Sequence, residues 1–130
     1  MYNNKKVVVV LPAYNAAKTL EKTILEIPRD LVDELILCDD ASNDETFELA
    51  RSLEVDQVLR HDKNKGYGAN QKTLYNRALE CGADIIIMLH PDYQYTPKLI
   101  PSMANIIGTD LFPVVLASRI LGKGALRGGM

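Results

Sequence analysis

With 130 residues, the chain has the length of a single domain, and its 47% hydrophobic and 25% charged residues are typical of a globular protein. This composition excludes collagen-like, low-complexity and wholly disordered chains. The 15 basic and 17 acidic side chains give a net charge of -2. Because there is no basic surplus to neutralise phosphates, the charge argues against a dedicated nucleic-acid-binding protein.

Cysteine usage and hydropathy indicate a cytoplasmic chain. Cys38 and Cys81 both lie among apolar residues, which indicates reduced thiols of the core and not a disulfide framework. The longest apolar run, at residues 7–11, is too short for a membrane span or for the apolar part of a signal peptide.

Apolar β-branched segments alternate with segments of helical periodicity along the chain. Strands are predicted at residues 6–11, 34–38, 56–60, 84–89 and 112–117. Helices are predicted at 16–27, after a capping box at 42–45, at 68–81 with Gly82 as the C′ residue, and from Pro97, capped by Thr96, to about 107. Short connections between the two kinds of element predict an α/β fold, with a mostly parallel sheet covered by helices on both faces.

The last ten residues differ from the rest. Residues 1–120 form the predicted domain, whereas 121–130 are Gly-rich and basic and carry no core pattern. We expect this tail to be the start of a C-terminal segment that the chain lacks. Truncation there would leave the strand at 112–117 as an exposed edge, through which a homodimer could form.

Polar and aromatic side chains follow the first four predicted strands where each strand ends. The segments are Pro12 to Asn15, Asp39 with Asp40, Arg60 and His61 followed by Lys63 to Gly68, and His90 to Gln94. Because ligands of open parallel sheets bind outside the carboxyl ends of the strands, we expect these segments to form a single cleft.

Each segment admits a ligand-binding interpretation and a plainer one. Asp39 is placed to accept hydrogen bonds from a base or ribose, although both aspartates could also be solvated acids or helix caps. The amides from Lys65 to Ala69, at a helix start with glycines, favour an anion, although a plain turn would use the same residues.

The segment after the fourth strand carries potential metal ligands. His90, Asp92 and Gln94 occupy alternate positions, which in an extended segment point to the same side and can converge on Mg²⁺ or Mn²⁺. The alternative is a turn with a buried neutral histidine and a solvated acid. No Cys/His cluster has zinc-ligand spacing, and the glycine pattern of a nicotinamide-binding turn is missing after the first strand.

These motifs, in this order, resemble family 2 glycosyltransferases, and within them the dolichyl-phosphate-mannose-synthase-like branch. The motifs are V-V-V-V-L-P-A-Y-N-A-A (7–17), L-I-L-C-D-D-A-S-N-D-E-T (35–46), K-N-K-G-Y-G-A-N (63–70) and M-L-H-P-D-Y-Q-Y-T-P (88–97). The resemblance implies the GT-A fold and transfer of a sugar from a UDP- or GDP-linked donor, assisted by a divalent metal, Mn²⁺ or Mg²⁺.

The resemblance also implies roles for individual residues. The residues that it implies for nucleotide-sugar binding are Pro12, Ala13, Tyr14, Asn15, Asp39, Asp40, Lys65, Gly66, Ala69 and Pro91. The metal ligands that it implies are His90, Asp92 and Gln94, and Asp92 is the best catalytic candidate. Two positions depart from the family pattern: His90 replaces the first aspartate of the metal motif, and Ala16 replaces the acid often found after P-A-Y-N.

The expected function is therefore that of a donor half-site. The acceptor is unknown, and a lipid-linked polyprenyl phosphate is the candidate that this branch suggests. That acceptor would place the parent protein at the inner face of the membrane, in the synthesis of cell-envelope polysaccharide. The alternatives are a non-catalytic nucleotide-binding module and an α/β signalling domain, although the latter carries its acid pair after the first strand.

Overall fold

The computed structural model describes residues 4–91 and 97–108. Their elements are β1 (Val7–Ala13), α1 (Ala17–Leu25), β2 (Glu34–Asp39), α2 (Thr46–Ser52), β3 (Gln57–Arg60), α3 (Tyr67–Glu80), β4 (Ile85–Met88), the 3-10 helix η1 (Pro97–Leu99) and α4 (Ile100–Gly108). The predicted alternation is confirmed over this part of the chain. The expected cap Thr96, the strand at 112–117 and the tail at 121–130 lie outside the described residues.

The described strands form a parallel sheet in the order β3-β2-β1-β4. Val9 of β1 pairs with Leu35 of β2 on one side and with Ile87 of β4 on the other. The order along the sheet therefore reverses at β1, which creates the switch point where open α/β sheets bind ligands.

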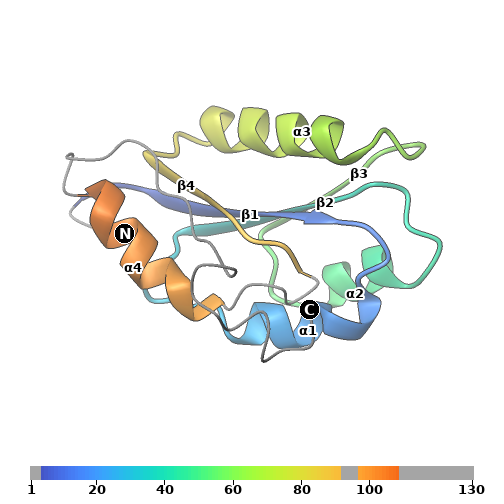
Figure 1. Cartoon of the computed structure of the whole chain (residues 1–130), viewed down its shortest axis with the longest axis horizontal. Helices are drawn as coiled ribbons and strands as arrows, with labels where there is room; N and C mark the ends of the chain where they lie inside the picture. The colour runs from blue at the N-terminus through green and yellow to red at the C-terminus, as the bar shows by residue number, and fades with distance from the viewer. Residues whose placement is uncertain (1–3, 92–96, 109–130) are drawn as a thin grey trace, which may run out of the picture.

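Helices cover both faces of this sheet, as predicted (Figure 1). Val8 and Val10 of β1 pack in a core cluster with Leu74 and Ala78 of α3. On the opposite face, the intervening β1 residues pack with side chains of α1, α2 and α4. Every residue of β1 is buried, which explains why the strand reads as a continuous apolar run without alternation.

Aspartates bind backbone amides at the amino-terminal edge of the sheet. The donor–acceptor pairs are Val7 N–H with Asp33, Leu35 N–H with Asp56, and Lys6 N–H with Asp84, at 2.7 to 2.8 Å. Each carboxylate precedes one strand and accepts from the neighbouring strand or, for Asp84, from Lys6 immediately before β1. These contacts connect neighbouring strands at their amino-terminal ends.

The helix and turn signals of the sequence had mixed outcomes. Gly82 has a φ of 79° directly after α3, which confirms it as the C′ residue. The capping box at 42–45 is wrong: the N–H of Thr46 is bound by Asp44 at 3.0 Å, while the Ser42 hydroxyl donates to Asp39. Both cysteines are free, as expected, but only Cys38 is fully buried.

Candidate functional site

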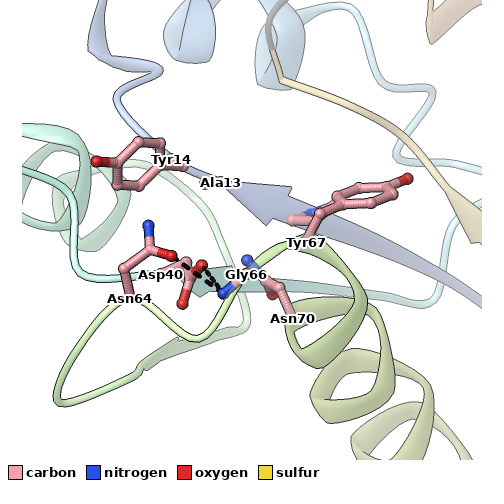
Figure 2. A pocket seen from close by; sticks show the side chains of 8 residues that line it. Ala13, Tyr14, Asp40, Asn64, Gly66, Tyr67 and Asn70 are labelled. Atoms are coloured by element: carbon pink, nitrogen blue, oxygen red, sulfur yellow. Dashed lines mark hydrogen bonds between the residues drawn. The ribbon is translucent and has the colours of Figure 1, made fainter.

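A pocket of about 160 Å³ lies where β1 and β2 end and α3 begins (Figure 2). Its lining residues are Pro12, Ala13, Tyr14, Asp40, Asn64, Gly66, Tyr67 and Asn70. Segments that follow β1, β2 and β3 in the sequence therefore meet in one concave site beside the switch point.

The loop after β1 is fixed by the loop after β2. The Asn15 N–H donates to Ser42 Oγ at 2.8 Å, and the Asn43 N–H donates to Asn15 Oδ1 at 2.9 Å. Asn15 has a φ of 50°, a left-handed conformation that asparagine tolerates better than most residues. Asn15 thus serves the loop backbone, and its neighbour Tyr14 is left 48% exposed at the pocket.

Asp39 lies behind the pocket wall and is not one of its lining residues. Its side chain is fully buried, and it accepts hydrogen bonds from the hydroxyl and, at 3.2 Å, from the N–H of Ser42. Arg60 Nε lies 3.3 Å from Asp39 Oδ2, with its guanidinium 4.8 Å from the centroid of the Phe47 ring. The contact of Asp39 with a base remains a prediction.

Asp40 fixes the backbone that precedes α3. Its Oδ1 accepts from the Lys65 N–H at 2.8 Å, and its Oδ2 accepts from the Gly66 N–H at 3.0 Å (Figure 2). The sequence led us to expect exposed amides for a ligand anion at this point. That expectation is wrong for Lys65 and Gly66, because a carboxylate of the chain itself is the anion they bind.

The pKa of the Asp40 carboxyl reflects these contacts. Burial acts to raise the pKa, but the Lys65 N–H, the His61 side chain and the Gly66 N–H together lower it below its usual range. Asp40 is thus ionised at neutral pH, as the paired backbone amides require.

Several predicted residues do not line the pocket. Lys65 is exposed, and Ala69 is half-buried in the first turn of α3. Pro91 is buried, and its carbonyl accepts hydrogen bonds from the hydroxyls of Thr19 and Thr23 of α1, across the sheet from α3. The nucleotide contacts assigned to these residues remain predictions.

Three lining residues had not been assigned to nucleotide binding: Asn64, Tyr67 and Asn70. All lie within the K-N-K-G-Y-G-A-N motif, and Asn64 and Tyr67 also lie in the segment that was expected to form the cleft. Asn70 is 2% exposed, and its side-chain N–H₂ donates to the carbonyl of Cys38 at 3.0 Å.

Of the predicted metal ligands, the described residues include only His90. Its Nε2 lies 3.0 Å from the hydroxyl of Tyr67. Ligation of a metal through Nε2 would therefore require the hydroxyl to move, whereas the donor types of His90, Asp92 and Gln94 themselves suit Mn²⁺. Within residues 4–91 and 97–108, no three metal-ligating side chains gather in one group. Asp92 and Gln94 lie outside those ranges.

A sequence model described as Glycosyl transferase family 2 matches residues 8–128. The chain belongs to this family. The match extends over β1, β2, the start of α3 and the segment after β4, which are the parts that carry the motifs given above.

Two curated relatives are named for dolichyl or dolichol phosphate. A UDP-N-acetylglucosamine–dolichyl-phosphate N-acetylglucosaminyltransferase of Methanococcus voltae is 28% identical over 90% of this chain and 53% of its own length. A dolichol-phosphate mannosyltransferase of Pyrococcus furiosus is 30% identical over 92% of this chain and 34% of its own length. The chain thus spans between a third and about half of these relatives.

Solved structures confirm the GT-A fold class. Glucosyl-3-phosphoglycerate synthase from Mycobacterium tuberculosis, in complex with Mn²⁺, UDP and glucosyl-3-phosphoglycerate, superposes with a TM-score of 0.66 at 26% identity. The superposition covers 80% of this chain and 40% of the synthase. Within the described ranges, no helix combines the length and the apolar character of a membrane span.

Proposed function

We propose that this chain is the donor-binding part of a glycosyltransferase that takes a sugar from a UDP- or GDP-linked donor. The observation that carries the proposal is the pocket at the ends of β1 and β2, because residues of three of the four family motifs, 7–17, 35–46 and 63–70, line it beside the switch point. The synthase of similar fold is named in complex with UDP and Mn²⁺, which supports a nucleoside diphosphate as the ligand.

Tyr14 is the proposed platform for the nucleobase. Tyr14 is 48% exposed and borders the pocket, which makes it available for stacking against a base. Asn64 and Asn70 line the same pocket and carry amide groups that can hydrogen-bond to a base or ribose. A pocket with aromatic walls and a small number of polar groups suits a nucleoside.

A divalent cation is proposed at the segment that starts with His90 and continues to Asp92 and Gln94. Such a cation, when bound, offsets the negative charge that develops on a leaving diphosphate. Because imidazole is a better ligand for Mn²⁺ than for Mg²⁺, His90 favours Mn²⁺ at this position. Asp92 remains the proposed principal ligand and the candidate catalytic residue.

A lipid-linked phosphate is the proposed acceptor of the whole enzyme. The relatives from Methanococcus voltae and Pyrococcus furiosus are named for dolichyl or dolichol phosphate. A phosphate acceptor is already ionised and needs no strong base for its attack on the anomeric carbon. We therefore expect the acceptor site in the part of the enzyme that the relatives have beyond this chain, with the parent protein working at the inner membrane face.

Binding of nucleotide to the chain tests the proposal. UDP or GDP at millimolar concentration with Mn²⁺ should raise the melting temperature, and isothermal titration should give a dissociation constant that depends on Mn²⁺. Asp92→Ala should abolish the metal-dependent part, whereas Asp62→Ala, at an exposed residue after β3, should not. Melting curves that neither nucleotide changes would contradict the proposal.

The same experiments separate the proposal from its rivals. Binding of UDP-sugar without hydrolysis or transfer, in the chain and in a longer parent protein, would identify a non-catalytic nucleotide-binding module. Phosphorylation by a small phosphodonor would identify a signalling domain, but the acid pair follows β2 and not β1, and Asp39 is fully buried. We therefore expect no phosphorylation.

A further inference from the structure

We propose that His61 is a positioning residue for the donor pocket, because it holds Asp40 in the orientation that fixes the backbone of Lys65 and Gly66. The inference rests on the proposed function for the ligand of the pocket, but the positioning itself is a property of the protein without ligand. His61 directly follows β3 and is not one of the residues that line the pocket.

His61 connects the end of β2 with α3 beneath the pocket. Its ring is 8% exposed, with Nδ1 2.8 Å from Asp40 Oδ1 and Nε2 2.9 Å from Thr73 Oγ1. The His61 N–H also donates to the carbonyl of Asp39 at 2.9 Å, which fixes the backbone that carries the ring. Both ring nitrogens and the backbone of His61 are thus tied to elements that surround the site.

Asp40 connects His61 to the wall of the pocket. It accepts from two successive amides, Lys65 N–H and Gly66 N–H, which therefore point at the same carboxylate. Gly66 has a φ of 91°, a value that lets successive amides converge and that side-chain-bearing residues rarely adopt. Gly66 lines the pocket and Tyr67 follows it, so Asp40 contributes to the position of this wall, together with Asn64 Oδ1, which accepts from the same Gly66 N–H at 3.0 Å.

The hydrogen atoms of the network can be assigned from its chemistry. The Asp40 carboxylate only accepts, so the Nδ1 of His61 must carry a hydrogen. The Thr73 hydroxyl can donate to Nε2 or to the Ala69 carbonyl, which lies 3.1 Å from its oxygen. In either charge state of the imidazole, the bond from Nδ1–H to Asp40 is therefore kept.

The network positions the wall and does not perform the chemistry. Cys38 Sγ lies 3.6 Å from His61 Nε2, so the ring contacts both a thiol and a hydroxyl. Burial raises the pKa of that thiol to about 12, with Asp40 and Asp39 adding to the effect, which leaves it unreactive. The imidazole is also buried and does not line the pocket.

Paired amide substitutions separate the two ring nitrogens. The side-chain nitrogen of asparagine can occupy roughly the place of Nδ1, and that of glutamine roughly the place of Nε2. His61→Asn should therefore keep the bond to Asp40, and His61→Gln should lose it, while both lose the ring. Thr73→Val removes the hydroxyl partner but leaves the bond to Asp40, and is the matched control.

The first readout is amide hydrogen exchange at Lys65 and Gly66, measured by NMR without ligand. His61→Gln should lower protection of these two amides about tenfold or more relative to the amides within α3, which begins at Tyr67. His61→Asn and Thr73→Val should keep it within about threefold. The second readout is affinity for UDP or GDP with Mn²⁺, which should fall about tenfold in His61→Gln and stay within about threefold in the other two variants.

The outcomes distinguish failure of the inference from failure of the proposed function. Equal protection of Lys65 and Gly66 in His61→Gln and in the unsubstituted chain would overturn the positioning role, as would equal losses in the Asn and Gln variants. If the unsubstituted chain binds neither UDP nor GDP, the proposed function fails while the exchange readout still decides the inference.

A measurement on the unsubstituted chain removes dependence on the folding of the variants. In ¹⁵N NMR of the imidazole, the hydrogen on Nδ1 of His61 should be seen, slow to exchange and coupled by nuclear Overhauser effects to the Lys65 amide region. An imidazole that carries its only hydrogen on Nε2 would overturn the inference without any substitution.

Discussion

The hydroxyl of Tyr67 lies 3.0 Å from Nε2 of His90, and the two rings stack with their centroids 5.3 Å apart. Tyr67 is the first residue of α3, and His90 follows β4, so this pair connects the pocket wall to the segment that leads to Asp92. The family motif that the sequence resembles carries an aspartate where His90 stands. The pair therefore includes the residue at which this chain departs in charge from the motif that it resembles.

His90→Asp should change the metal preference of the proposed donor site. A carboxylate supplies the negative charge and the oxygen donor that Mg²⁺ prefers, so nucleotide affinity in Mg²⁺ should rise about tenfold, with a smaller gain in Mn²⁺. Titration calorimetry with UDP or GDP in each metal measures this. Tyr67→Phe removes the hydrogen bond between the Tyr67 hydroxyl and His90 Nε2 and controls for its loss. His90→Asn supplies an oxygen donor without the charge, and equal affinities of His90→Asp and His90→Asn in Mg²⁺ would contradict the expectation.

Tyr14→Ala should weaken nucleotide binding by about tenfold or more. Stacking of a base on an aromatic ring is worth about 1–3 kcal/mol by alanine substitution, and the ring of Tyr14 is exposed beside the pocket. The dissociation constant for UDP or GDP provides the measurement. Tyr75→Ala on α3 is the matched control, because this tyrosine is similarly exposed but is not one of the lining residues. Equal effects of the two substitutions would argue against a base at Tyr14.

The order of elements could be predicted because it depends on local patterns. A continuous apolar run such as β1 suits only a strand that is covered on both faces, and Gly82 after α3 is a local stop signal. Register and strand order could not be predicted, since they depend on how β1 pairs with both β2 and β4. The convergence of the loops followed from a general rule of parallel sheets and not from any single residue.

The hydrogen-bond partners of individual side chains could not be predicted from the sequence. Ser42 was expected to cap α2, but a hydrogen bond to Asp39 and one from the Asn15 N–H take its hydroxyl instead. Asp40 was expected beside a ligand and does line the pocket, but its hydrogen bonds to the amides 25 and 26 residues further along the chain could not be predicted. Such long-range contacts compete with the local motif, and the local pattern contains no information about which of them wins.

The free energy of unfolding should fall as the pH drops below about 4. Burial acts to raise the pKa of Asp44, but hydrogen bonds from the Thr46 hydroxyl, the Thr46 N–H and the Ala17 N–H lower it below its usual range. A pKa lower in the folded state means that the stabilisation is complete above the unfolded value, about 3.9, and is lost as the pH falls through the folded value. Asp40 adds to this in the same direction.

Urea denaturation between pH 7 and pH 3 measures this dependence. Asp44→Asn should remove part of the loss between pH 4 and pH 3, because the amide does not titrate. Asp62→Asn, at an exposed residue, serves as the control. A pH profile that is identical in all three proteins would show that Asp44 contributes nothing to acid sensitivity.

Leu74→Ala should lower the free energy of unfolding by about 2–5 kcal/mol. Leu74 is fully buried between α3 and the sheet, where it packs in one cluster with Val8 and Val10, so truncation leaves a cavity. Leu79→Ala, on the same helix but at a residue 62% exposed, should change stability by no more than about 0.5 kcal/mol. Similar losses in the two variants, measured by urea denaturation, would mean that α3 does not pack as described.

Asp56 allows the backbone contact and the ion pair of one carboxylate to be compared. Its Oδ2 accepts from the Leu35 N–H at 2.7 Å and lies 3.1 Å from Nη2 of Arg29. Asp56→Ala leaves an amide of the buried Leu35 without this acceptor, which should cost about 1–3 kcal/mol. Arg29→Ala removes an exposed ion pair and should cost at most about 1 kcal/mol.

The double variant decides which contact carries the stabilisation. If the hydrogen bond from the Leu35 N–H dominates, Asp56→Ala should lower the free energy of unfolding by nearly the same amount with Arg29 present or absent. The coupling energy between the two residues then stays below about 0.5 kcal/mol. Denaturation of the four proteins in urea at pH 7 and low salt measures the cycle. A coupling as large as the whole effect of Asp56→Ala would assign the stabilisation to the ion pair, and the aspartates that bind strand amides would lose their proposed role in tying the sheet together.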